Sequence, residues 1–194
     1  RRESNDRFLK RRIDMNRKII LQILLVLFIY TLVGCASGAR YSAMIPDDHS
    51  ILPVPENFFL KNAITLKEVT GGEETNPMWT SEVGGQELKK ALEESLRRKQ
   101  LLTPPNTGGK YNLSVNLEKV DQPMFGFSFT VTSTADYLLR NNETKDITFD
   151  QKISASYTAT FGDAAYGPTR LKLANEGSIR ENIRQFIEKL LLLN

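Results

Sequence analysis

Three long segments in which apolar and polar residues alternate constrain the fold of this chain more than any other feature. Residues 111–118, 127–139 and 147–161 place apolar side chains at nearly every second position. Because successive side chains of a β-strand point to opposite faces, this period predicts strands with one buried and one solvated face. The pair Asn141-Asn142 predicts a turn between the last two strands. These segments therefore require a mostly antiparallel sheet with a cover on one face.

One further strand and two helices complete the predicted fold. Residues 62–70 alternate weakly and predict a strand, and apolar residues at helical spacing predict helices over 81–100 and 171–193. The resulting order is βαβββα. It predicts a two-layer α+β sandwich, with a four-stranded, mostly antiparallel sheet and two helices on one face. If the strands on either side of the first helix are parallel, the connection between them is a crossover.

Local signals set the expected starts of the helices. Ser81 is the expected N-cap of the first helix. In the second helix Gly177 weakens the early part, and Ser178 with Glu181 forms a possible capping box. We therefore expect the strong part of this helix to begin near Ser178.

An apolar run near the beginning of the chain predicts a targeting signal. Ile19–Val33 is about 15 residues long, shorter than the roughly 20 that a membrane-spanning helix needs. A basic segment, Met15-Asn16-Arg17-Lys18, precedes the run, and Leu32-Val33-Gly34-Cys35 closes it. This order is typical of a secretory signal peptide. The alternative is an uncleaved signal anchor that carries a chance cysteine.

The closing tetrapeptide resembles the lipobox of bacterial lipoproteins. The resemblance implies cleavage between Gly34 and Cys35, a diacylglycerol on the Cys35 thiol and acylation of the new amino group. Several acyl chains anchor a protein stably where one does not. Ala36 follows the cysteine where an aspartate would imply retention in the inner membrane. The resemblance thus implies an envelope protein in the outer membrane that faces the periplasm.

These features divide the chain into four parts. We expect residues 1–14 to be an upstream extension, 15–34 a signal peptide, 35–60 the lipidated cysteine with a flexible tether, and 61–194 a globular α+β domain. Three prolines and a pair of aspartates in residues 36–60, without periodicity, favour an extended tether.

Charge and rare residues exclude several classes of function. The formal net charge is +3, but residues 1–35 hold eight basic and three acidic side chains, which leaves the remainder mildly acidic. A nucleic-acid partner is therefore not expected. The chain has one cysteine and one histidine, too few for an internal disulfide or a Cys/His zinc site. We predict no metal, no cofactor and no catalytic residues, so the chain is not expected to be an enzyme.

The element order, taken together with the lipobox and the proline-containing tether, resembles small bacterial envelope lipoproteins of the YajG type. A more distant similarity links it to the lipopolysaccharide-assembly lipoprotein LptE and to auxiliary lipoproteins of lipid-transport systems. The resemblance covers about 130 residues and rests on element order, so it implies a location and a fold but no functional residue.

Several aromatic residues are candidate partner contacts. Trp79 precedes the first helix and could anchor a partner or close the helix entrance. Met124 and Phe125 occupy a turn and could form an apolar rim, whereas Phe127 fits the alternation of a core strand. Tyr166 lies in the loop 162–168 and could touch a ligand or belong to a plain connector.

A row of hydroxyl side chains defines the remaining candidate surface. Thr130 and Thr132 belong to the polar side of the third predicted strand, so they should lie on the uncovered face of the sheet. Such a face, or an open strand edge, can receive a partner.

The leading hypothesis is a membrane-anchored, non-catalytic adaptor or assembly factor that contacts another envelope protein or a lipid-linked ligand. The alternative is a lipid or glycolipid carrier with an apolar pocket between helices and sheet. An envelope enzyme is a third possibility with less support.

Overall fold

The computed structural model describes Gln22 and residues 38–72, 83–123 and 125–193. The chain divides into two compact units, Arg1–Cys35 and Ala36–Asn194. The second unit contains, in chain order, η1 (Tyr41–Ala43), η2 (Asp48–Ser50), β1 (Ile64–Gly71), α2 (Gly85–Arg98), β2 (Tyr111–Asp121), β3 (Phe129–Asn141), β4 (Ile147–Ala159) and α3 (Gly167–Leu191).

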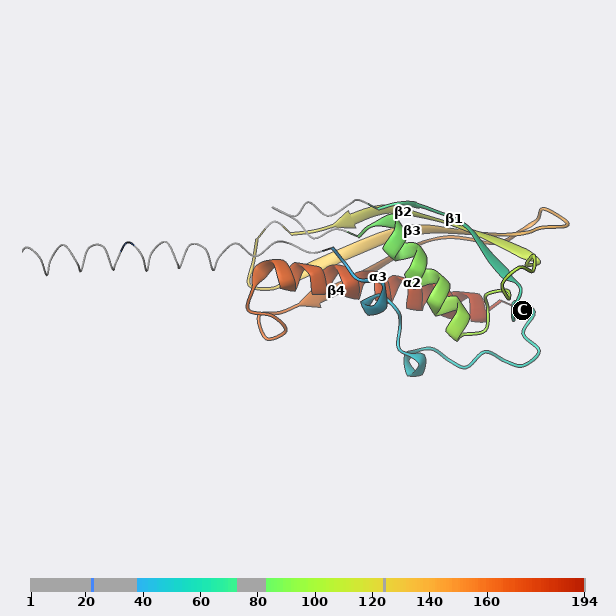
Figure 1. The fold of residues 1–194 in the computed structure, drawn as a ribbon, viewed down its shortest axis with the longest axis horizontal. Helices are drawn as coiled ribbons and strands as arrows, with labels where there is room; N and C mark the ends of the chain where they lie inside the picture. The colour runs from blue at the N-terminus through green and yellow to red at the C-terminus, as the bar shows by residue number, and fades with distance from the viewer. Residues whose placement is uncertain (1–21, 23–37, 73–82, 124, 194) are drawn as a thin grey trace, which may run out of the picture. The chain divides into compact units, whose positions relative to one another are not determined.

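The four strands form one sheet in the order β1-β2-β3-β4. β1 and β2 are parallel and are connected through α2, whereas the β2–β3 and β3–β4 pairs are antiparallel. α3 packs on β3 and β4, α2 packs on β1, and both helices lie on the same side of the sheet (Figure 1). The predicted fold class, a two-layer α+β sandwich with a mostly antiparallel sheet, is confirmed.

The alternating pattern of β3 is reproduced without interruption. Every odd-numbered residue from Phe129 to Leu139 is buried, and the intervening residues are exposed or half-buried. The inward side chains meet the apolar stripe of α3, where Tyr137 stacks on Phe186 with ring centroids 4.0 Å apart. Phe149 meets the same Phe186 ring edge-on at 5.7 Å. Aromatic side chains thus fill the space between α3 and the sheet.

The boundaries of the strands differ from the sequence prediction at one end of the sheet. Phe127 was expected to face the core, but β3 begins at Phe129 and Phe127 is 88% exposed. β4 ends at Ala159, so Phe161 lies beyond the strand and is also exposed. Ile147, Gln151 and Tyr157 are exposed as well, because β4 is an edge strand and α3 covers only part of its inner face.

α3 is longer than predicted, and its glycine has a packing role. The helix begins at Gly167, with a proline in its first turn, so the expected capping box is wrong. Ser178 instead donates its hydroxyl to the Asn175 carbonyl within the helix, at 3.0 Å. A Cβ atom on Gly177 would lie 2.2 Å from Cδ1 of Tyr157, which explains a glycine inside this helix. At this residue the backbone of α3 leaves no room for a side chain beside the Tyr157 ring of β4.

The segment before β1 is packed against the domain. The prediction of a flexible tether over 35–60 differs from the structure for residues 38–60, because Met44, Ile51 and Leu60 are buried in the main core. η1 contacts both α2 and α3 (Figure 1). The prolines of this segment do not keep it away from the core, because apolar residues before, between and after them belong to the same buried cluster as residues of α2 and the sheet. The domain therefore begins well before residue 61.

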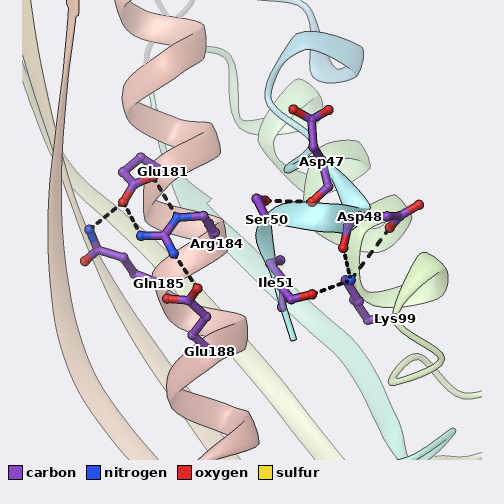
Figure 2. A network of polar contacts seen from close by, with 9 residues as sticks. All are labelled: Asp47, Asp48, Ser50, Ile51, Lys99, Glu181, Arg184, Gln185 and Glu188. Atoms are coloured by element: carbon purple, nitrogen blue, oxygen red, sulfur yellow. Dashed lines mark hydrogen bonds and ion pairs between the residues drawn. The ribbon is translucent and has the colours of Figure 1, made fainter. Parts of the chain in front are cut away.

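Lys99 holds the second part of this segment. Its Nζ donates to the carbonyls of Asp48 at 2.8 Å and Ile51 at 3.3 Å, and it lies 3.9 Å from a carboxylate oxygen of Asp48 (Figure 2). Figure 2 also shows a separate ion-pair network on α3, where Arg184 contacts Glu181 and Glu188. The hydrogen bond from Arg184 lowers the pKa of Glu181, so this carboxylate stays charged at neutral pH.

The first helix begins at Gly85 with Gly84 at the N-cap position, later than predicted. Ser81, the expected N-cap, lies outside the described residues. No helix in the described part of the chain has the length and apolar character needed to cross a bilayer.

Candidate interaction surfaces

The uncovered face of the sheet carries two facing rows of hydroxyl groups, one on β3 and one on β4. The register places Thr130 opposite Thr158, Thr132 opposite Ser156, and Thr134 opposite Ser154. Each pair shares a hydroxyl–hydroxyl hydrogen bond, of 2.8, 2.8 and 2.9 Å respectively. The predicted hydroxyl row is thus on the open face, and it is paired across the strands.

Charged residues continue this face beyond the hydroxyl rows. Lys152 on β4 donates to Glu118 on β2 at 2.6 Å and lies 3.7 Å from a carboxylate oxygen of Asp136 on β3. The hydrogen bond to Glu118 raises the pKa of Lys152. The open face therefore combines short hydroxyl side chains with a charge cluster, and it presents no large apolar side chain at these positions.

The edge of the sheet at β4 is open in the described part of the chain. β4 has 13 residues and pairs only with β3. Strands usually have about five or six residues, and a long unpaired edge can accept an added strand. Asp150 and Lys152 place charges along β4, which is a common way to discourage unspecific edge pairing.

Exposed aromatic residues gather at one end of the sheet, which we call the aromatic end: Phe125, Phe127, Phe161 and Tyr166. Phe125 and Phe127 lie in the β2–β3 loop and are 84% and 88% exposed. Phe161 and Tyr166 lie in the β4–α3 loop and are 59% and 44% exposed. Phe129 and Ala159 are register partners, so the two loops leave the sheet side by side.

Arg170 in the first turns of α3 connects the two loops. Its Nη1 donates to the Ala164 carbonyl at 2.7 Å, and its Nη2 donates to the Gly126 carbonyl at 3.2 Å. The guanidinium carbon lies 4.9 Å from the ring centroid of Phe129 and 5.6 Å from that of Phe161. Arg170 itself is buried, so its guanidinium group contacts the two loops and not the solvent.

The chain enters the domain along α3. The backbone N–H and Nε of Arg40 both donate to Oε1 of Glu176, at 3.0 and 3.2 Å. Three residues later, the Ala43 carbonyl accepts from Nη1 of Arg180 at 2.7 Å. Ala39 is buried immediately before these contacts. The entering chain is thus fixed to α3 from Ala39 onward.

A second polar cluster lies inside the domain and is closed to solvent. Asn182 on α3 donates to the carbonyls of Ser133 at 3.1 Å and Ile153 at 2.9 Å, and it accepts from the Tyr137 hydroxyl at 2.8 Å. Burial raises the pKa of Tyr137 above its ordinary range. Ser133 donates to the Ser178 carbonyl at 3.0 Å. This cluster fixes α3 to β3 and β4 and has no access for a ligand.

The described residues include some of the predicted site residues and not others. Gly34, Cys35, Trp79 and Met124 lie outside the described residues. Phe125 and Tyr166 come together at the aromatic end, while Thr130 and Thr132 lie on the open face of the sheet. Within the described ranges, no cluster of three or more His, Cys, Asp or Glu side chains is placed to hold a metal ion.

Sequence reasoning missed the residues that organise these surfaces, namely Arg170, Glu176 and Asn182. Asn182 had a detectable signal, because it interrupts the apolar stripe formed by Ile179, Ile183 and Phe186. Arg170 and Glu176 had none, since charged residues near the start of a helix are common and their partners are distant in sequence.

Comparison with known proteins shows similarity of fold but no match at the level of sequence. No protein-family model and no curated protein matches the chain. Among solved structures, a DUF330 protein from Xanthomonas campestris has a TM-score of 0.52 at 7% identity, covering 77% of this chain and 91% of that one. At this identity the likeness shows the fold alone.

Two further structures are similar at TM-scores below 0.5. A minor lipoprotein from Acinetobacter baumannii has a TM-score of 0.45 at 8% identity, covering 69% of this chain and 94% of that one. A hypothetical protein from Chlamydia trachomatis has a TM-score of 0.46 at 9% identity, covering 68% and 98%. The resemblance to YajG-type lipoproteins stays a prediction.

Proposed function

We propose that this chain is a lipid-anchored envelope protein, attached through Cys35, whose folded domain is a non-catalytic adaptor or assembly factor. The anchor is supported by the order of basic segment, apolar run and Leu32-Val33-Gly34-Cys35. Ala36 after the cysteine favours the outer membrane, with the domain in the periplasm. The partner is another envelope protein or a lipid-linked ligand.

The observation that carries the adaptor role is the open edge of β4 beside the open face. Among the described elements both helices cover one side of the sheet, so the outer face of β3 and β4 and the 13-residue edge stay accessible. An extended partner segment can hydrogen-bond to such an edge, and its outward side chains then lie beside the hydroxyl row of β4. Paired hydroxyls of uniform size offer a flat surface for that contact.

A partner on the outside is favoured over a lipid carried between the layers. A carrier needs an apolar space between helices and sheet. In this domain the Tyr137 ring stacks on Phe186, and Phe149 packs on the same ring. Tyr137 and Phe186 are both fully buried, so aromatic side chains already occupy the volume next to α3.

The anchor is tested by comparing the wild-type chain with Cys35→Ser, both expressed from Met15 in a bacterial host. We expect the wild type to lose the segment before Cys35, gain the mass of acyl chains and fractionate with the outer membrane. Cys35→Ser should keep the segment and gain no acyl mass. If both proteins keep it and stay in the inner membrane, Ile19–Val33 is a signal anchor and the proposal is wrong.

The adaptor role is tested by photo-crosslinking in the living envelope. A photoreactive amino acid is placed at Thr132 on the open face, at Asp150 along the edge strand, or at Lys189, an exposed control position on α3. We expect one discrete adduct at Thr132 or Asp150 that is absent at Lys189. Equal or absent adducts at all three positions would contradict a partner site on this face, as would turnover of an envelope substrate by the purified protein.

A further inference from the structure

The aromatic end is unusual because its side chains are exposed yet held in position. Phe125 and Phe127 are among the most exposed apolar residues of the described chain. The loop that carries them is fixed by the hydrogen bond from Arg170 to the Gly126 carbonyl, and the neighbouring loop is fixed by the bond to Ala164. Exposed apolar patches with a fixed shape mark contact sites.

Traced backwards from Ala43, the entering chain leads toward this end of the domain. Arg40 contacts Glu176 and Ala43 contacts Arg180, so residues 40–43 run in the same direction as α3. Arg40 therefore lies nearer the start of α3 than Ala43 does. Glu176 and Arg170 are six residues apart on the helix, an axial distance of about 9 Å.

The link between a lipid on Cys35 and the domain is short. Ala39 is the first buried residue of the described chain, and four residues can span at most about 14 Å. A domain held by so short a link lies directly against the bilayer. The side that faces the bilayer is then the side near which the chain enters, where the aromatic end lies.

We propose that the aromatic end inserts into the interfacial region of the bilayer that holds the Cys35 lipid, as a second point of membrane contact. This inference rests on the lipid anchor proposed above. Aromatic side chains are favoured at the boundary between headgroups and acyl chains, where apolar rings leave water while nearby polar groups stay hydrated. The contact would orient the domain, with the open edge of β4 presented at a fixed angle to the membrane.

The charge at this end limits the depth of insertion. Asp163 lies between Phe161 and Tyr166 and accepts hydrogen bonds from the backbone N–H and the hydroxyl of Thr160, at 2.7 and 2.8 Å. These bonds lower the pKa of Asp163, so the carboxylate stays ionised. An ionised side chain at the tip belongs at the level of the headgroups. The rings beside it then reach the boundary of the acyl chains and no deeper.

The test uses the lipidated protein, purified from membranes and reconstituted in phosphatidylcholine vesicles with or without brominated acyl chains. Trp79→Phe removes the only tryptophan, and a new one is introduced by Phe127→Trp at the aromatic end or by Ile147→Trp at the opposite end of the sheet. Both positions are exposed. If Trp79→Phe lowers the thermal midpoint, Trp79 is retained and the quenching is taken as the difference from the parent protein.

We expect about twofold lower emission from Phe127→Trp in brominated vesicles, because interfacial side chains lie about 5–10 Å into the headgroup and acyl boundary. Ile147→Trp should emit equally in both vesicles. The intact mass and the flotation of each variant show separately whether the protein carries its lipid anchor. A protein without acyl mass would therefore disprove the proposed anchor and not this contact. Acylated, floating protein with equal quenching at both positions, or with none, would overturn the membrane contact and leave the aromatic end to a protein partner.

Discussion

β3 and β4 carry polar side chains on both faces, and the two faces use them differently. On the open face, the hydroxyl groups of Thr132 and Ser156 form a hydrogen bond with each other and are in contact with water. On the covered face, Ser133 and Tyr137 depend on α3, through Ser178 and Asn182. Hydrogen bonds in water contribute little net stability, whereas a buried polar group that loses its partner costs the full loss of hydration. The covered face should therefore be sensitive to substitution and the open face tolerant.

The largest expected effect is that of Asn182→Ala. The change removes hydrogen bonds to the Ser133 and Ile153 carbonyls and to the Tyr137 hydroxyl, all inside the core. We expect a loss of about 3 kcal/mol in the free energy of unfolding, measured by urea denaturation. Asn116→Ala is the matched control on the open face, where Asn116 pairs with the Thr70 hydroxyl, and should change stability by less than about 0.5 kcal/mol. Equal losses of stability in Asn182→Ala and Asn116→Ala would contradict the expected difference in sensitivity between the two faces.

Gly177→Ala tests how closely α3 approaches the sheet. The new methyl group would meet the Tyr157 ring at 2.2 Å, and such overpacking costs about 1–3 kcal/mol. Because alanine favours a helix by about 1 kcal/mol over glycine, we expect a net loss of about 0–2 kcal/mol. Gly162→Ala is the control, since its nearest neighbour would be the Thr160 hydroxyl oxygen at 3.5 Å. A Gly177→Ala protein more stable than the wild type would contradict the close packing.

Tyr137→Phe tests whether the stability that the covered face provides depends on pH. At neutral pH the variant leaves the side-chain amide oxygen Oδ1 of Asn182 without its donor, and we expect a loss of about 1 kcal/mol. Burial raises the pKa of Tyr137 in the folded state, so the stability it gives is complete below about pH 10 and is lost as the pH rises further. The wild type should therefore lose up to about 1.4 kcal/mol per pH unit relative to the variant above pH 10. Urea denaturation at pH 8 to 11 measures both effects, and parallel curves would contradict the buried hydroxyl.

The same contrast explains what the sequence could predict. Alternation in β3 requires only that one face be apolar, so the order of elements and the placing of Thr130 and Thr132 followed from the pattern. The pattern contains no information on which distant residues meet. The Arg40–Glu176 contact, 136 positions apart, and the bond from Arg170 to the β2–β3 loop arise from packing.

Two predictions failed for a related reason. Prolines suggested a tether over 35–60, but apolar residues along 38–60 are buried in the core, and Lys99 donates hydrogen bonds to two backbone carbonyls of that segment. Phe127 continued the apolar alternation of β3, yet the strand begins two residues later and the ring points away from the core. Periodicity describes what a regular element would bury and does not show where that element begins.

The smallest expected effect compares two neighbours on opposite faces of β3. Ser133→Ala leaves the Ser178 carbonyl without its donor inside the core, and we expect a loss of about 1 kcal/mol. Thr132→Val removes a hydroxyl that faces Ser156 near water, and it keeps a β-branched side chain that suits a strand. We expect a change within about 0.5 kcal/mol, measured by thermal and urea unfolding of both variants side by side. If Thr132→Val lowers the free energy of unfolding as much as Ser133→Ala does, the hydroxyl rows stabilise the sheet. If Thr132→Val leaves the free energy of unfolding unchanged, these side chains remain available to a partner. Photo-crosslinking at Thr132 then measures that role without interference from unfolding.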